Sequence, residues 1–116
     1  MAFADGEVIA FDKNDRPTVE GIQYRDKRTG AWRHYFYDQN IYTEREYTDG
    51  EAGRETYYLI TTKSPYSGTF YLKYSNGSLQ LQFKISDGLR NGNSKYYKEN
   101  GVLERTEKYR KGLLQN

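Results

Sequence analysis

The chain has 116 residues, a formal net charge of +2, no cysteine and a single histidine, His34. Its length indicates one domain, and the missing cysteines exclude a disulfide framework, a thiol nucleophile and a thiolate zinc site. A single histidine excludes a metal site built from several, so we expect neither a metal nor a cofactor. Thirteen tyrosines and one tryptophan supply the apolar surface for a core, because an aromatic ring can bury its body and keep its polar tip in water.

The N-terminal half contains two predicted repeats and an insert. The first repeat, over residues 7–29, is weak, and a clearer one follows over residues 30–50. Residues 51–67 form the insert, which has its own predicted strand over residues 56–62 and the turn signal Ser64-Pro65.

The C-terminal half consists of two further repeats, over residues 68–88 and 92–112. Their glycines, their Asn-Gly pair and the leucine after it coincide at a shift of 24 residues. The coinciding residues are Gly68, Asn76, Gly77, Leu79 and Gly88 in one copy and Gly92, Asn100, Gly101, Leu103 and Gly112 in the other. A repeat this short is not stable alone, so neighbouring repeats must bury each other's apolar face.

Turn and strand signals agree on an all-β fold. Asn-Gly pairs at residues 76–77, 91–92 and 100–101 each predict a type I′ hairpin turn, which needs positive φ at both central residues. Residues 78–85 alternate apolar and polar side chains without a fault, as in a half-buried strand. We therefore predict a single elongated antiparallel β meander of three to four hairpin repeats, in one domain over residues 1–116.

The repeats resemble those of the MORN family, and in particular its bacterial variant form. Units of that form look like G-x-x-x-x-Y-Y-x-x-N-G-x-L followed by Y-x-x-G, and the resemblance covers residues 30–50 and 68–112. The last repeat matches nearly in full, through Gly92, Tyr96, Tyr97, Asn100, Gly101, Leu103, Tyr109 and Gly112. The resemblance implies a twisted β platform for interactions, with antitoxin or immunity roles in bacterial proteins and phospholipid binding or scaffolding in eukaryotic ones.

Strand parity divides the predicted sheet into two faces. The face expected to form the core carries Trp32, Phe70, Leu72, Leu79, Leu81, Phe83, Ile85, Tyr96, Leu103 and Tyr109. The opposite face carries a column of cations and tyrosines, our candidate partner-binding residues, namely Arg33, Tyr35, Tyr37, Tyr71, Lys73, Lys95 and Tyr97. Tyrosine and arginine are enriched at protein-binding hot spots, the same composition suits base stacking over a basic groove, and cross-strand pairing alone also accounts for it.

Titratable residues give no catalytic constellation. Glu44 and Glu46 share one strand face, which suits acid–base chemistry or a divalent cation. With Arg45 and Arg54 close in sequence, a solvated, charge-balanced edge is favoured, and an acidic surface for a basic partner is the alternative. His34 has no nucleophilic partner in the pattern, so we expect it to be structural and the protein to have no catalytic residues.

Charge is divided unevenly along the chain. Residues 1–56 carry twelve acidic and eight basic side chains, and residues 57–116 carry four and ten. We see neither a membrane-spanning run nor a signal peptide and expect a cytoplasmic location.

We predict a non-enzymatic protein that binds a toxin, effector or defence enzyme and inhibits it by steric occlusion, like an immunity protein, antitoxin or phage-encoded inhibitor. The alternative is an anionic ligand, nucleic acid or a phospholipid surface, held by the basic C-terminal half. The cations of that half are Lys73, Lys84, Lys95, Lys98, Arg105, Lys108, Arg110 and Lys111.

Overall fold

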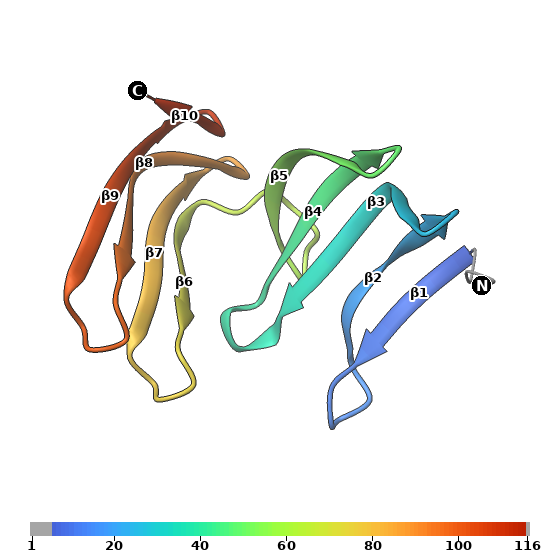
Figure 1. Cartoon of the computed structure of the whole chain (residues 1–116), viewed down its shortest axis with the longest axis horizontal. Coiled ribbons are helices and arrows are strands. Elements are labelled where there is room, and N and C mark those ends of the chain that lie inside the picture. The colour runs from blue at the N-terminus through green and yellow to red at the C-terminus, as the bar shows by residue number, and fades with distance from the viewer. Residues whose placement is uncertain (1–5, 116) are drawn as a thin grey trace. The chain divides into compact units, whose positions relative to one another are not determined.

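The computed structural model describes residues 6–115, and the chain divides into two compact units. Unit 1 runs from Met1 to Ser64 and unit 2 from Pro65 to Asn116. Each unit holds one five-stranded antiparallel sheet whose strands pair in chain order (Figure 1). The all-β, antiparallel prediction is confirmed. The prediction of one continuous meander is wrong, because the chain forms two sheets.

Unit 1 buries its core mainly under its third, fourth and fifth strands. Its elements are β1 (Gly6–Phe11), β2 (Pro17–Tyr24), β3 (Lys27–Phe36), the 3-10 turn η1 (Tyr37–Gln39), β4 (Ile41–Thr48) and β5 (Glu51–Leu59). The buried side chains are Trp32, Ile41, Tyr42, Thr43 and Tyr57. Trp32 packs directly against β2, where a Cβ at Gly21 would lie only 2.1 Å from the indole ring. Glycine at position 21 therefore lets the ring approach the backbone, and the indole N–H donates to the Ile22 carbonyl at 3.0 Å.

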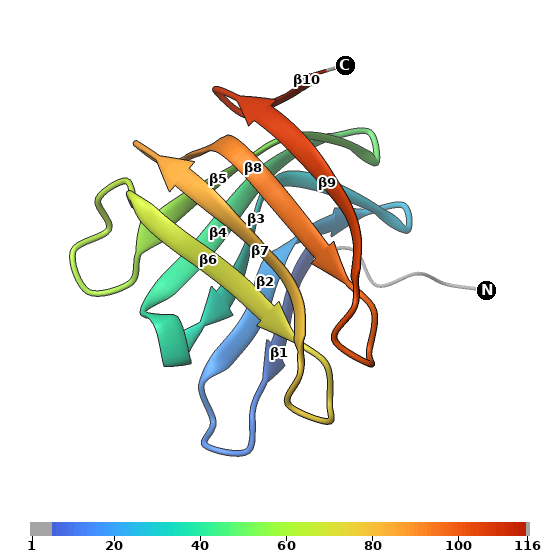
Figure 2. The same ribbon diagram turned by 90° about the vertical axis from the view of Figure 1, so that its left-hand side faces the viewer.

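Unit 2 places four strands side by side and ends in a short edge strand (Figure 2). Its elements are β6 (Gly68–Lys73), β7 (Leu79–Ser86), β8 (Leu89–Tyr97), β9 (Leu103–Arg110) and β10 (Leu113–Gln115). Phe70, Phe83 and Ile85 are buried, as the alternation of residues 78–85 predicts for the last two. Leu103 is 49% exposed, against expectation. The reason is that a register shift sets Leu103 opposite Tyr97 and not in step with Arg105, and that β10 pairs only with the last three residues of β9 and leaves its start at the edge.

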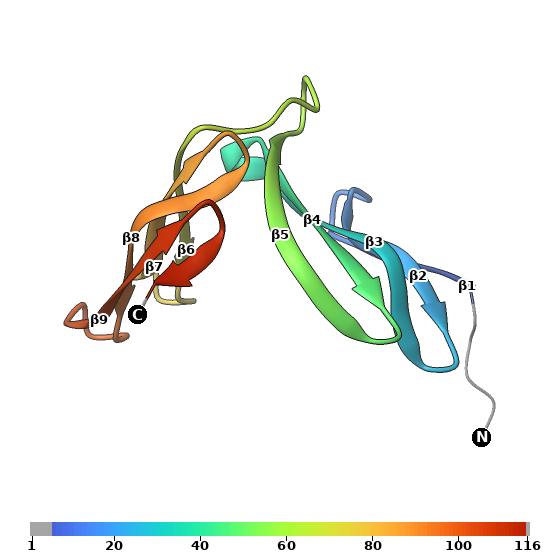
Figure 3. The same ribbon diagram turned by 90° about the horizontal axis from the view of Figure 1, so that it is seen from above.

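The two sheets are separated by residues 60–67, which Figure 3 shows leading away from β5. The strand predicted over residues 56–62 ends at Leu59, because the chain turns there and the Lys63 amide donates to the Leu59 carbonyl at 2.9 Å. Pro65 then lacks the N–H that a ladder would need. As a result β5 and β6 are both edge strands.

The predicted repeats fall on hairpins. Residues 7–29 contain most of β1, all of β2 and the start of β3, and residues 30–50 contain the rest of β3 and all of β4. Residues 68–88 contain β6 and β7, and residues 92–112 contain most of β8 and all of β9. That these hairpins are MORN repeats stays a prediction.

The turns between successive hairpins share one geometry. Both central residues have positive φ, as type I′ turns require, in Asp49-Gly50, Asp87-Gly88 and Lys111-Gly112. Each of these glycines donates its N–H to a carbonyl that precedes it by 22 residues, that of Arg28, Tyr66 or Arg90, at 3.1, 2.8 and 2.8 Å. The turn that ends one repeat is thus hydrogen-bonded to the segment that opens it.

The Asn-Gly pairs are not type I′ turns, which corrects the prediction. At residues 76–77 and 100–101 only the glycine has positive φ, 90° in each case. Asn76 instead keeps an ordinary backbone and accepts the Ser78 N–H on its side-chain oxygen at 2.9 Å, an interaction that asparagine favours in wider turns. The pair at residues 91–92 lies inside β8, where Gly92 has φ 102° beside a register shift.

No helix in residues 6–115 is long and apolar enough to cross a membrane.

Candidate functional site

The two units differ in charge, and each presents one surface with features of a binding site. Unit 1 carries twelve acidic and nine basic side chains, a net charge of −3. Unit 2 carries four and nine, a net charge of +5.

The candidate surface of unit 1 is a row of tyrosine rings that crosses three strands, with half-buried rings at Tyr35, Tyr37 and Tyr58 around the buried Tyr42. Tyr35 on β3 stands opposite Tyr42 on β4, which stands opposite Tyr58 on β5. The ring centroids of Tyr35 and Tyr42 lie 5.6 Å apart, and those of Tyr42 and Tyr58 lie 5.2 Å apart. Tyr37 extends the row, stacked on Tyr35 at 5.7 Å. We call this surface, with the side chains of β1 and β2 on the same side, the tyrosine face.

Polar contacts fix the tyrosine row in place. The Tyr35 hydroxyl donates to the Glu20 carboxylate at 2.5 Å, and burial together with this bond raises the pKa of Tyr35 to about 12. The Tyr37 hydroxyl donates to the Pro17 carbonyl at 2.6 Å. Arg33 lies between two carboxylates, 3.9 Å from Glu20 and 3.7 Å from Glu44. The rings are therefore already ordered before any partner arrives, which lowers the entropy lost on binding.

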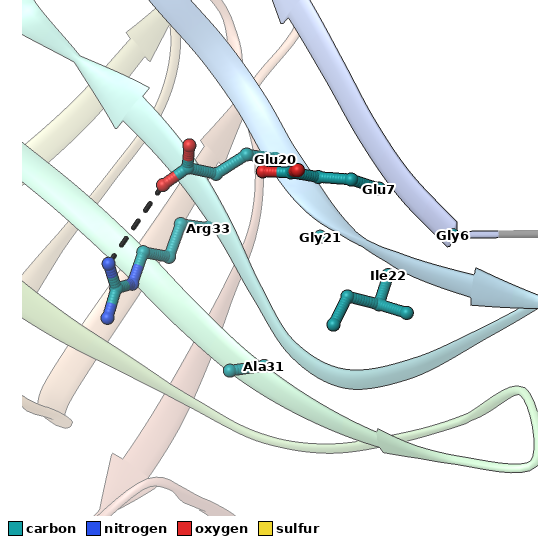
Figure 4. A pocket seen from close by; sticks show the side chains of 7 residues that line it. All are labelled: Gly6, Glu7, Glu20, Gly21, Ile22, Ala31 and Arg33. Carbon is teal, nitrogen blue, oxygen red and sulfur yellow. Dashed lines mark ion pairs between the residues drawn. The ribbon is translucent and has the colours of Figure 1, made fainter.

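A hollow of about 530 Å³ adjoins the row on β1, β2 and β3. Figure 4 shows Arg33 pointing toward Glu20, with Glu7 on the neighbouring strand. The small residues Gly21 and Ala31 also line the hollow. Ile22 lies at the hollow and is 53% exposed. The hollow thus combines Glu7, the Glu20–Arg33 ion pair and an exposed apolar side chain, a composition suited to a basic side chain with an apolar stem.

The candidate surface of unit 2, the lysine face, is the polar side of β6 to β9. Tyr71 on β6 stands opposite Gln82 on β7, which stands opposite Lys95 on β8. Lys84 and Lys108 lie on the same side on the flanking strands β7 and β9. Gln82, Lys84, Asn93, Lys95, Tyr97 and Lys108 line a hollow of about 390 Å³. Among the residues that line this hollow there is no Asp or Glu.

The other side of unit 2 holds Arg90 and Arg105 in contacts with rings and, for Arg105, with carboxylates. Arg105, which we expected among the anion-binding cations, stacks on Tyr96 at 4.0 Å and pairs with Glu104 and Glu107 at 3.5 and 3.6 Å. It stands opposite Tyr96 in the ladder, so it lies on the side of the sheet away from the lysine face. Arg90 likewise stacks on Phe83 at 3.8 Å. These two arginines therefore stabilise the core side.

The seven candidate residues do not form the one column that we predicted. Three of them, Arg33, Tyr35 and Tyr37, lie together on the tyrosine face of unit 1. The other four, Tyr71, Lys73, Lys95 and Tyr97, belong to the lysine face of unit 2. Sequence reasoning missed Glu20, Tyr42, Tyr58 and Asn93, whose places depend on cross-strand register.

His34 and Glu44 each contact a neighbouring side chain in unit 1. His34 stacks on Phe36 with 4.5 Å between ring centroids, and partial desolvation lowers its pKa. Glu44 is bound to Arg33, as noted above. In the part of the chain from residue 6 to residue 115, no group of three or more His, Asp or Glu side chains is arranged to hold a metal ion.

Comparison with known proteins returned no relative: no protein-family model, no curated protein and no solved structure matches the chain.

Proposed function

We propose that this protein is a non-enzymatic binding protein that docks on another protein through the tyrosine face of unit 1 and inhibits it by covering its surface. The observation that supports this is the ordered row of tyrosines beside a hollow with an exposed isoleucine. Large, rigid aromatic side chains with polar tips, next to an arginine, are the residue types that dominate protein-binding hot spots. Exposed Ile9 and Ile22, 38% and 53% accessible, add apolar surface on the same side.

The partner that fits this surface carries basic residues. Glu7 and Glu20 flank the hollow, and unit 1 as a whole is acidic. A partner that binds nucleic acid, such as a nuclease, presents such a basic surface, and opposite charges speed the encounter. Immunity protein, antitoxin and phage-encoded inhibitor are three versions of this one mechanism, steric occlusion of the partner's working surface.

The test begins with affinity capture from a lysate of the encoding organism, after nuclease treatment. The captured protein is purified, its affinity for the wild-type chain is measured, and its own activity is assayed with and without the chain. We expect Ile22→Ser and Glu7→Lys to weaken binding by about tenfold or more each, the loss expected for a buried apolar or charged contact. Inhibition should fall in parallel.

Two matched variants control for exposure and charge. Val102→Ser removes an apolar side chain that is 54% exposed in unit 2, and Glu51→Lys reverses a charge on β5, outside the hollow. Both should bind as the wild type does. Equal losses in the control and test variants, or a partner whose activity the bound chain leaves unchanged, would count against the proposal.

A further inference from the structure

Three lysines of unit 2 differ from Arg105 in having no ion pair within the described residues. Within residues 6–115, Lys84, Lys95 and Lys108 take part in no ion pair, whereas Arg105 is bound to two carboxylates. Glu104, at a register shift of the β8–β9 ladder, pairs with Arg105 at 3.5 Å. The positive charge of this face is therefore not neutralised by the protein itself.

The three lysines surround one hollow. Asn93 stands opposite Lys108, and Lys84 passes the neighbouring Gly92, with its Cβ and Cδ each 3.8 Å from the position that a Cβ on the glycine would take. Lys95 lies two residues after Asn93 on β8, about 7 Å from it along the strand. Because Gly92 has no side chain, the space between the lysines stays open to a ligand.

An unstacked ring completes the hollow. Tyr97 lines it and is half-buried, but within the described residues its ring makes no ring contact, in contrast to the four stacked tyrosines of unit 1. A base has the flat face that such a ring can stack on, and a phosphate has the charge that lysines attract. Lys73 on β6 and Arg110 on β9 continue the positive charge beyond the hollow on either side.

We propose that the lysine face of unit 2 binds single-stranded nucleic acid, with backbone phosphates at Lys84, Lys95 and Lys108 and a base stacked on Tyr97. A single strand fits better than a duplex, because only an unpaired base can turn its face to a tyrosine ring. This site is independent of the protein-binding function, since it lies in the other unit and takes a ligand of opposite charge.

The experiment measures binding of two fluorescein-labelled probes of about 12 nucleotides, oligo-U RNA and oligo-dT DNA, by fluorescence anisotropy. Three phosphate contacts to a single strand predict that log K falls with log salt with a slope of about −2. Lys95→Gln and Lys108→Gln should each make this slope shallower by about 0.7. Tyr97→Leu should weaken binding by about 5- to 150-fold without changing the slope, and Tyr97→Phe should restore it.

Lys13→Gln is the matched control, because it removes the same charge from an exposed turn in unit 1. It should leave the affinity and the salt slope unchanged, and a thermal melt of each variant confirms that it is folded. Three results would overturn the proposal: Lys95→Gln and Lys108→Gln binding like Lys13→Gln, a duplex of equal length binding as tightly as the single strand, or binding to anionic lipid vesicles with none to either probe.

Discussion

Units 1 and 2 share a backbone plan and differ in what they do with their polar face. Both are five-stranded meanders with type I′ turns between successive hairpins. In unit 1 the tyrosines of the polar face contact one another, and Tyr35 and Arg33 are bound to carboxylates. In unit 2 the lysines of the corresponding face take part in no ion pair within residues 6–115, and Lys73 lies over the Tyr71 ring at 5.5 Å. The turns and the core thus define the sheet, and the outward positions are free to take opposite chemistries.

The core sides of the two units are more alike. Arg28 in unit 1 lies over Trp32 at 4.3 Å and over Tyr47 at 5.4 Å. Arg90 in unit 2 lies over Phe83 at 3.8 Å and over Tyr109 at 5.0 Å. Each arginine comes two residues before a glycine, and its carbonyl accepts the N–H of a turn glycine. The repeated element is therefore an arginine held between aromatic rings at the turn.

The largest expected effect is a loss of unfolding free energy in unit 2 that leaves unit 1 unchanged. Phe83 is 2% exposed and packs on Phe70, so Phe83→Ala should cost unit 2 about 3–5 kcal/mol of unfolding free energy, through lost burial and a cavity. Trp32 is the sole tryptophan and lies in unit 1, so its fluorescence follows that unit, whereas circular dichroism follows both. We expect the variant to lose part of its dichroism early in a urea titration, while the Trp32 transition keeps its midpoint.

Leu114→Ala is the control for this variant, because Leu114 is 50% exposed on the edge strand β10. It should shift neither transition by more than about 0.5 kcal/mol. If Phe83→Ala lowers the Trp32 midpoint as much as the dichroism midpoint, the two units unfold as one cooperative body and do not have separate stabilities.

Sequence patterns predicted the strands and hairpins well because both depend on local chemistry. Alternation placed Phe83 and Ile85 on the core side, and the glycines at positions 77, 88, 101 and 112 lie in turns, whereas Asn91-Gly92 lies inside β8. The break between the sheets was missed because residues 56–62 have strand propensity throughout. The chain ends β5 at Leu59 through hydrogen bonds formed by the following turn, which propensity does not describe.

The candidate sites were predictable only in part, for a related reason. Parity within one strand placed Arg33 and Tyr35 on one side together, and did the same for Tyr71 and Lys73. Which residue stands opposite them depends on register, and register depends on turn geometry. Glu20 and Tyr42 became visible as parts of the tyrosine face only once the strands were paired.

An intermediate effect tests the ordered state of the tyrosine face through its pH dependence. The pKa of Tyr35 is raised from 10.0 to about 12, so folding favours the protonated phenol. Its contribution to stability is complete below pH 10 and is lost as the pH rises from 10 to about 12. Tyr35→Phe should lower the unfolding free energy by about 1.5 kcal/mol at neutral pH, through the lost bond to Glu20, and should show a smaller further loss above pH 10.

The measurement is urea unfolding followed by Trp32 fluorescence at neutral pH and at several values above 10. Titration of the lysines and the other tyrosines affects the wild type and the variant alike, so the difference between the two isolates Tyr35. A difference that stays constant across the range would mean that the Tyr35 phenol is not held by the fold.

The smallest expected effect concerns how unit 2 secures the turns between its hairpins. Residues that precede the opening glycine of a repeat accept a turn amide: the Ser67 hydroxyl from Asp87 at 2.8 Å, and the Asn91 side-chain oxygen from Lys111 at 3.1 Å. Asn91→Ala removes the second bond at an exposed site and should cost about 0.5–1 kcal/mol of unfolding free energy, measured as a shift of the dichroism transition.

Asn93→Ala is the control, because Asn93 lies two residues away on the same strand and lines the lysine hollow. It should leave stability unchanged and weaken only nucleic-acid binding. If both variants lose the same stability, the asparagines act through the strand and not through the turn.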